Sequence, residues 1–189
     1  MARAEWARCG EFTRAPARLD VPPVAIDNRP MTQAHLSPAR RDDAARLAAM
    51  SRRLIESGLD PCWTAERIER QLNNHDCVVL VARFGRHVVG FAIMQYGDDA
   101  AHLNLLAVEA GHRRHGIGRQ LIGWLEDTAR VAGTFAIRLE VRATNCGARA
   151  FYAALGYRET GWVRGYYQGV EDAVRFSRDL SLASSAETR

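Results

Sequence analysis

The sequence contains no lysine, so all 26 of its basic residues are arginine. The formal net charge is +4, and residues 1–41 hold seven arginines against four acidic residues, which leaves the rest of the chain nearly neutral. A basic balance that is concentrated at one end gives little support to nucleic-acid binding by the folded part. We therefore expect no nucleic-acid partner for that part.

Long apolar runs and paired cysteines are also missing. No stretch reaches the roughly 18–20 apolar residues of a membrane span, and the N-terminus lacks the apolar segment of a signal peptide. The four cysteines include no C-x-x-C pair, and their spacing fits neither a zinc site nor a disulfide scaffold. We expect a cytoplasmic protein with free thiols, no metal and no membrane association.

Proline is nearly absent after the N-terminal region, because five of the six prolines precede residue 40. Residues 1–30 are rich in Ala, Arg and Pro without a period of 2 or 3.6, so they predict a flexible extension. Residues 31–182 have the length and composition of one globular domain, and 183–189 form a polar tail. Met31 could instead be the native start, which the intact mass of the native protein would decide.

The remaining sequence alternates between strand and helix patterns. Strands are expected at 32–36, 77–83, 88–94, 101–108, 135–141, 157–163 and 174–180. One helix is expected after Ser37 and Pro38, a second from Ala65 to Leu72 behind the cap Thr64, and others at 117–132 and 146–155. The order is β-α-α-β-β-β-α-β-α-β-β.

This order predicts an α/β (α+β) fold. Tight turns between the second, third and fourth strands favour antiparallel pairing, whereas the helical crossover after residue 108 requires at least one parallel pair. The expected structure is a mixed central sheet of six to seven strands with helices on both faces.

The region around which the chain is organised is a loop rich in glycine and arginine, between a strand that ends at Val108 and the following helix. The unpaired N–H groups and the dipole of a helix N-terminus attract anions. Gly116 and Gly118 allow a close approach to the backbone. The pattern predicts a site for a diphosphate.

The segment from Arg113 to Gly118 (RRHGIG) resembles the (Gln/Arg)-x-x-Gly-x-(Gly/Ala) signature of the GNAT superfamily of acetyl-CoA-dependent N-acetyltransferases. LLAV before it, and LEVRATN and AFYAALGY after it, follow in family order and spacing. The closest resemblance is to the RimI-like ribosomal-protein alanine N-acetyltransferases. It covers the architecture of 32–180 and is firm at residue level for 103–172, whereas the first two helices do not clearly match.

The resemblance implies the GNAT fold and acetyl-CoA as co-substrate, with its pyrophosphate on the glycine loop and its pantetheine arm along the preceding strand. The residues expected to bind it are Leu106, Ala107, Val108, Arg113, Arg114, His115, Gly116, Ile117, Gly118, Arg119 and Asn145. Asn145 also has a purely structural interpretation as a helix cap.

Acetyl transfer requires a neutral amine, yet α-amino groups and Lys amines are largely protonated at pH 7. Glu140 is the candidate base, because the family places its strand beside the thioester and alternation points it away from Leu139 and Val141. We expect partial burial to raise the pKa of Glu140. Tyr152, off the helix stripe of Phe151 and Leu155, is the candidate proton donor to the leaving thiolate. The alternatives are a surface ion pair for Glu140 and simple packing for Tyr152.

Several other residues have weaker interpretations. His102, His112 and His115 lack metal-ligand spacing, and Cys146 lacks a His–acid partner. The sequence predicts a loop that contains Tyr166 and Tyr167 and could border the acceptor. The acceptor could also be bordered by Trp63 and Glu66, near the start of the second helix.

Two classes of function stay open on the sequence. The first is an active N-acetyltransferase acting by direct attack in a ternary complex, with a protein N-terminus or a small amine as acceptor. The second is a catalytically silent, CoA-binding regulatory module. A homodimer is left open, and so is nucleic-acid binding by residues 1–30.

Overall fold

The computed structural model describes residues 34–181. The expected extension at 1–30, the first residues of the expected strand 32–36 and the tail 183–189 lie outside this range. The described elements are β1 (His35–Pro38), η2 (Arg41–Asp43), α1 (Ala44–Leu54), α2 (Ala65–Leu72), β2 (Cys77–Phe84), β3 (His87–Gln95), β4 (Ala101–Val108), η3 (Ala110–His112), α3 (Ile117–Val131), β5 (Ala136–Arg142), α4 (Cys146–Ala154), β6 (Arg158–Tyr167) and β7 (Glu171–Asp179).

These strands form one seven-stranded sheet in the order β1-β2-β3-β4-β5-β7-β6. All neighbours are antiparallel except β4 and β5, which pair in parallel. The expected mixed sheet is therefore confirmed, and so is the expected parallel pair, which α3 connects.

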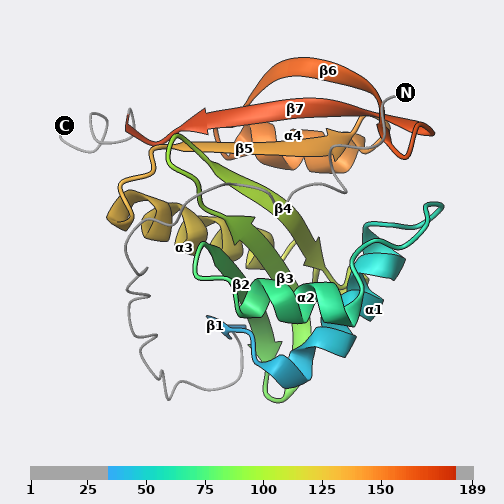
Figure 1. Cartoon of the computed structure of the whole chain (residues 1–189), viewed down its shortest axis with the longest axis vertical. Coiled ribbons are helices and arrows are strands. Elements are labelled where there is room, and N and C mark those ends of the chain that lie inside the picture. Colours follow the sequence, from blue (N-terminus) through green and yellow to red (C-terminus); the bar gives the residue numbers. More distant parts are fainter. Residues whose placement is uncertain (1–33, 182–189) are drawn as a thin grey trace.

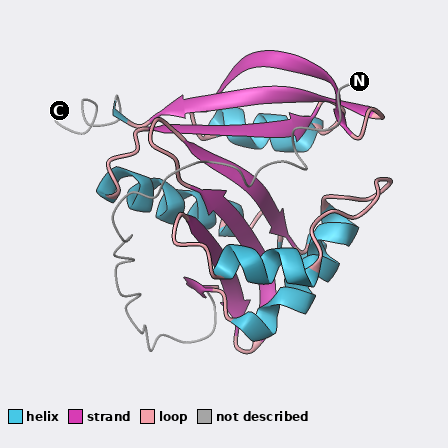
Figure 2. Ribbon diagram, viewed as in Figure 1, coloured by secondary structure: helices cyan, strands magenta, loops and turns pink. Residues whose placement is uncertain are grey.

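Helices cover both faces of the sheet (Figures 1 and 2). The apolar sides of α3 and α4 pack on one face with the inner residues of β3, β4 and β5, and α1 and α2 pack on the other. Thr64 caps α2 as predicted, since its hydroxyl oxygen accepts the Arg67 N–H at 3.3 Å. The two layers leave β5 and β7 without a helix on the α1 side, and the site forms there.

Two local predictions are wrong. Ser37 and Pro38 lie in β1, and α1 begins only at Ala44 after a 3-10 turn. Pro38 is tolerated because β1 is an edge strand, where a missing N–H costs no pairing. The last hairpin is longer than expected, because β6 runs through Tyr167 and only residues 168–170 form the turn.

Candidate active site

The sheet opens between β4 and β5. These strands pair only at Ala101–Ile137 and His102–Arg138, near their start. Beyond this point β4 pairs with β3, and β5 pairs with β7. Figure 1 shows the two strands diverging. A cavity of about 280 Å³ lies at the divergence, with walls from β4, β5, the α1–α2 loop, α4 and β6.

A β-bulge in β4 turns additional side chains toward this cavity. Leu103 and Leu105 pair with consecutive residues of β3, so Asn104 between them has no partner there. Leu103 packs in the α3 layer and Leu105 in the α1 layer, which shows that the bulge reverses the alternation. His102, Asn104 and Leu105 consequently all line the cavity.

Glu140 lies on the cavity side of β5, while both its chain neighbours are buried in the opposite layer, as alternation predicted. Its Oε2 lies 2.7 Å from Nε2 of His102 and accepts a hydrogen bond from the Tyr166 hydroxyl at 3.1 Å. Its Oε1 accepts one from Nε of Arg175 at 3.2 Å. Three strands thus hold one carboxylate.

The pKa of Glu140 lies below its ordinary value. Burial raises it, but the hydrogen bond and charge of His102, the hydrogen bond from Tyr166 and the charge of Arg175 together outweigh burial. The expectation of a raised pKa was wrong, because the sequence does not show how many donors converge on a half-buried carboxylate.

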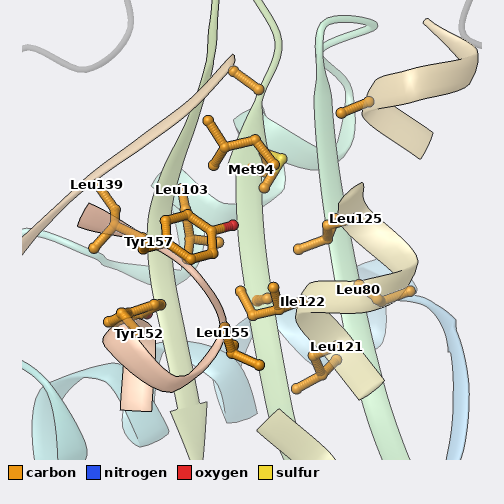
Figure 3. Packing of buried hydrophobic residues seen from close by; sticks show 14 of the residues in the cluster. Leu80, Met94, Leu103, Leu121, Ile122, Leu125, Leu139, Tyr152, Leu155 and Tyr157 are labelled. Atoms are coloured by element: carbon orange, nitrogen blue, oxygen red, sulfur yellow. The ribbon is translucent and has the colours of Figure 1, made fainter. Parts of the chain in front are cut away.

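Tyr152 is the buried side chain of α4, so its expected position off the apolar stripe is wrong. Its ring packs edge-on against Phe151 and Tyr157, with centroids 5.1 and 5.6 Å apart. Figure 3 shows it in one cluster with Tyr157, Leu139 and Leu155. Tyr152 also lines the cavity, and burial raises the pKa of its phenol, which therefore stays protonated as a proton donor must.

Asn145 is both a cap and part of the cavity wall. Its Oδ1 accepts the Ala148 N–H at 3.0 Å, which confirms the structural interpretation, and the residue lines the cavity. The next turn of α4 meets the glycine loop, since a Cβ added at Gly118 would lie 3.1 Å from the Phe151 ring. The cap, the glycine loop and the cavity are thus adjacent.

The loop before α3 has the backbone geometry of an anion site. Arg114 and Gly116 both have left-handed backbones, with φ of 68° and 79°. No side chain caps this helix end, and hydrogen bonding into the helix begins with the Gln120 N–H on the Gly116 carbonyl. The N–H groups of the first turn, from Ile117 to Arg119, therefore have no partner within the helix.

Arg113 is placed differently from the other basic side chains of this loop. Nε of Arg113 donates to the Val108 carbonyl at 3.0 Å, so its side chain folds onto the end of β4. Arg114, His115 and Arg119 are exposed. The expected pantetheine segment, Leu106 to Val108, lies on β4 beyond its pairing with β5.

Tyr166 and Tyr167 reach the cavity from β6 and not from a loop. The Tyr167 hydroxyl donates to the Glu140 carbonyl at 3.3 Å, so both tyrosines hold the β5 backbone and side chain at this point. Trp63 is buried and lines the cavity from the α1–α2 side. Glu66 is exposed and lies outside the lining.

A second, larger hollow of about 890 Å³ adjoins the cavity at His102 and Glu140, which line both. Its other walls are the β3–β4 turn and the exposed sides of β5, β6 and β7. Asp98, Asp99 and Arg138 give it mixed charge. The space beside Glu140 therefore extends along the open face of the sheet.

Three residues at the site were missed from the sequence. No motif points to Asn104 or Arg175, and His102 has no ligand or acid partner nearby in the sequence. Parallel pairing of β4 with β5 was the available signal, since it places His102 beside the Glu140 strand.

The other candidates take no part in the cavity. His112 stacks beside Phe84 with centroids 5.4 Å apart, and Cys146 is exposed at the start of α4. Within residues 34–181, no group of three or more His, Cys, Asp or Glu side chains could hold a metal ion. In the same part of the chain, no helix is long and apolar enough to cross a membrane.

Several known proteins have sequences similar to this chain. The [ribosomal protein bS18]-alanine N-acetyltransferase of Salmonella typhimurium is 39% identical over 98 residues, which cover 50% of this chain. The N-alpha-acetyltransferase RimI of Mycobacterium tuberculosis is 32% identical over 161 residues, covering 82% of this chain and 97% of that protein. The chain spans 66% of the Salmonella enzyme and 41% of a further curated relative, which is uncharacterised.

Solved structures agree with the fold. The ribosomal-protein-S18-alanine N-acetyltransferase from Escherichia coli superposes with a TM-score of 0.69 at 27% identity, over 82% of this chain and 98% of that one. The model of the Acetyltransferase (GNAT) family matches residues 46–157, which include β4, the glycine loop, Glu140 and Tyr152. The diverging strands and the uncapped helix start are thus features of a chain that belongs to the GNAT acetyltransferase family.

Proposed function

We propose that this protein transfers the acetyl group of acetyl-CoA to the α-amino group of a protein or peptide N-terminus. The observation that carries the choice of acceptor is the 890 Å³ hollow that adjoins Glu140 and runs over the open sheet face. A small amine needs only a closed pocket, whereas an extended peptide needs such a path beyond its first residue. The names of the two enzymes from Salmonella and Mycobacterium support the same acceptor class.

Acetyl-CoA fits this chain as co-substrate. The uncapped N–H groups at the start of α3 suit its pyrophosphate, and the β4 edge from Leu106 to Val108 is the place for its pantetheine arm. Arg114, His115 and Arg119 are exposed beside this end of the helix, where positive charge favours phosphate.

The catalytic groups act in sequence on the acceptor amine and the thioester. Glu140 receives a proton from the acceptor ammonium, and the free amine attacks the thioester carbonyl. A backbone N–H near Val108 polarises the carbonyl oxygen. Tyr152 supplies a proton to the departing thiolate from the other wall of the cavity. Attack is direct, so no covalent enzyme intermediate forms.

Parallel assays of the full chain with acetyl-CoA test this function. One panel holds peptides with different free N-termini, and the other holds polyamines, amino acids and aminoglycosides. We expect kcat/KM for the best peptide to exceed that for every small amine by at least about tenfold, or about 1.4 kcal/mol. A small amine that reacts as well as the best peptide would overturn the acceptor class.

Turnover by variants distinguishes the enzyme from a silent CoA-binding module. We expect Glu140→Gln to lower kcat by about 10- to 10⁴-fold with unchanged acetyl-CoA affinity. Glu159→Gln, which alters an exposed ion pair with Arg149, is the matched control and should keep full activity. Acetyl-CoA binding without turnover in the wild type would favour the silent module. The cytoplasmic location and a homodimer stay predictions.

A further inference from the structure

The imidazole of His102 bridges two acceptors. Nε2 lies 2.7 Å from Oε2 of Glu140, and Nδ1 lies 3.0 Å from Oδ1 of Asn104. A carboxylate oxygen and an amide carbonyl oxygen both accept hydrogen bonds, so each of these contacts requires a proton on the ring nitrogen or on the carboxyl group. The ring is thus placed to share a proton with Glu140.

The contact with Asn104 determines which ring nitrogen of His102 shares a proton with Glu140. The amide carbonyl cannot take up a proton at ordinary pH, so Nδ1 keeps its hydrogen and Nε2 is left to face the carboxylate. The amide nitrogen of Asn104 is buried without a hydrogen-bond partner among the described residues. Leaving a buried amide N–H group unsatisfied is unfavourable, and the contact of the carbonyl with His102 gives a reason for this orientation of the amide.

Asn104 lies at the bulge in β4, on the same face of the strand as His102. On a regular strand, the side chains at 102 and 104 would share this face with the residue at 106, but here Leu106 packs in the α3 layer. The bulge therefore leaves His102 and Asn104 side by side on the face of the Glu140 side chain and reverses the faces of the residues that follow.

Other charged groups face the pair from each neighbouring strand. Arg175 on β7 donates to Oε1 of Glu140, and the Tyr166 hydroxyl on β6 donates to Oε2. Arg138 on β5 lines the adjoining hollow, as do Asp98 and Asp99 of the β3–β4 turn.

The two remaining charged residues of the cavity are engaged elsewhere. Glu56 accepts the backbone N–H groups of Cys62 and Trp63. Arg142 forms an ion pair with Glu171 at 2.7 Å. Neither is therefore assigned a part in the proton exchange of His102.

A carboxylate held by this many donors is a weak base toward an ammonium group when it acts alone. A neutral imidazole alters this, because its Nε2 lone pair faces the carboxylate at close range and the two repel each other until a proton lies between them. The pair then titrates as one unit with a greater affinity for a proton than an isolated carboxylate has.

We propose that His102 is a positioning residue that makes Glu140 half of a carboxylate–imidazole couple, and that this couple, oriented by Asn104, accepts the proton of the acceptor amine. The proposal rests on the function above, in which Glu140 receives that proton.

The proton balance is simple. An N–H bond of the acceptor ammonium breaks, its electron pair stays on nitrogen, and the couple holds the proton between Oε2 and Nε2. The free amine forms the new bond to the acetyl carbonyl carbon, and the C–S bond breaks. The second proton lost by that nitrogen goes to the thiolate, with Tyr152 as the donor that is refilled. The couple then releases its proton to water in the hollow that His102 and Glu140 both line.

Nitrogen NMR of the full chain with ¹⁵N-labelled histidine tests the couple without any acceptor. The signals of His102 are identified by their loss in His102→Gln, and those of exposed His87 by their loss in His87→Gln. We expect both ring nitrogens of His102 to stay protonated at least about one pH unit above the reference histidine pKa of about 6.5. Glu140→Gln should remove this difference.

Asn104→Asp is the second variant. An aspartate can only accept, so it should extend the doubly protonated form of His102 to still higher pH. A His102 ring that titrates at the reference histidine pKa of about 6.5, or whose titration is the same in Glu140→Gln and Asn104→Asp as in the wild type, would overturn the couple.

Steady-state kinetics tests whether the His102–Glu140 couple takes part in catalysis. With the best peptide of the panel, we expect His102→Gln to lower kcat by about 10- to 100-fold and to shift the acidic limb of kcat/KM by at least about one pH unit. KM for acetyl-CoA should not change, and His87→Gln should behave as wild type. A wild-type pH profile in His102→Gln would refute the role of His102, whereas absence of turnover in the wild type would refute the proposed function itself.

Discussion

Gln168 and Asp60 exchange two hydrogen bonds next to Leu59 and Tyr167, which line the cavity. The Asp60 N–H donates to Oε1 of Gln168 at 2.9 Å, and Nε2 of Gln168 donates to the Asp60 carbonyl at 2.7 Å. One residue belongs to the α1–α2 loop and the other to the β6–β7 turn. A single side chain thus ties together two loops that come from opposite ends of the sequence and border the site.

Removal of this tie should loosen the acceptor side of the cavity. We expect Gln168→Ala to raise KM for a peptide several-fold, with little change in KM for acetyl-CoA, and to lower the free energy of unfolding by about 1 kcal/mol. Gln168 has a left-handed backbone with φ of 57°, so Gln168→Gly removes the same bonds while relieving that strain. The glycine variant should therefore show the same change in KM with a smaller loss of stability. Equal acceptor KM in all three proteins would contradict this role.

Because the pKa of Glu140 is lowered in the folded protein, part of the free energy of unfolding depends on pH. A carboxyl group whose pKa is lower in the folded than in the unfolded protein contributes stability that is fully present above the unfolded value. That contribution is lost as the pH falls through the folded value. We expect urea unfolding curves of the wild type to shift downward between pH 5 and 3 more steeply than those of Glu140→Gln. An equal or smaller slope in the wild type would show that its neighbours do not favour the charged form.

Tyr152 should be needed for its hydroxyl group and not for its packing. We expect Tyr152→Phe to keep the ring contacts with Phe151 and Tyr157, and so to leave the thermal midpoint within a few degrees of wild type. We expect kcat to fall at least about tenfold, because thiolate departure loses its proton donor. Tyr157→Phe is the control, since the Tyr157 hydroxyl bonds Glu126 at 3.0 Å, away from the cavity. That variant should lose stability while keeping kcat.

Gly118 should be required at the acetyl-CoA loop. An added Cβ would lie 3.1 Å from the Phe151 ring, so Gly118→Ala should shift either the ring or the helix start and weaken acetyl-CoA binding by about tenfold. Gly123 lies on the same helix with open space around it. Gly123→Ala should therefore leave acetyl-CoA affinity unchanged and add about 0.5–1 kcal/mol of stability. Calorimetric titration with acetyl-CoA measures the first effect, and equal affinities in the two variants would contradict it.

The sequence by itself determined the order of elements, the mixed sheet and the position of the glycine loop before α3. These follow from apolar periodicity, glycine placement and short-range caps such as Thr64 and Asn145, all of which act over a few residues. The direction of Glu140 also followed from alternation along β5.

Only the tertiary structure decided what surrounds that carboxylate. His102, Tyr166 and Arg175 come from three different strands, and each of them contacts the carboxylate of Glu140. Tyr152 was expected off the apolar stripe of its helix but is buried for a similar reason, because it packs against β5 and β7. Periodicity reports which residues are apolar. The pKa of Glu140 depends on how many donors converge on it, and that number is set by the pairing of strands far apart in the chain.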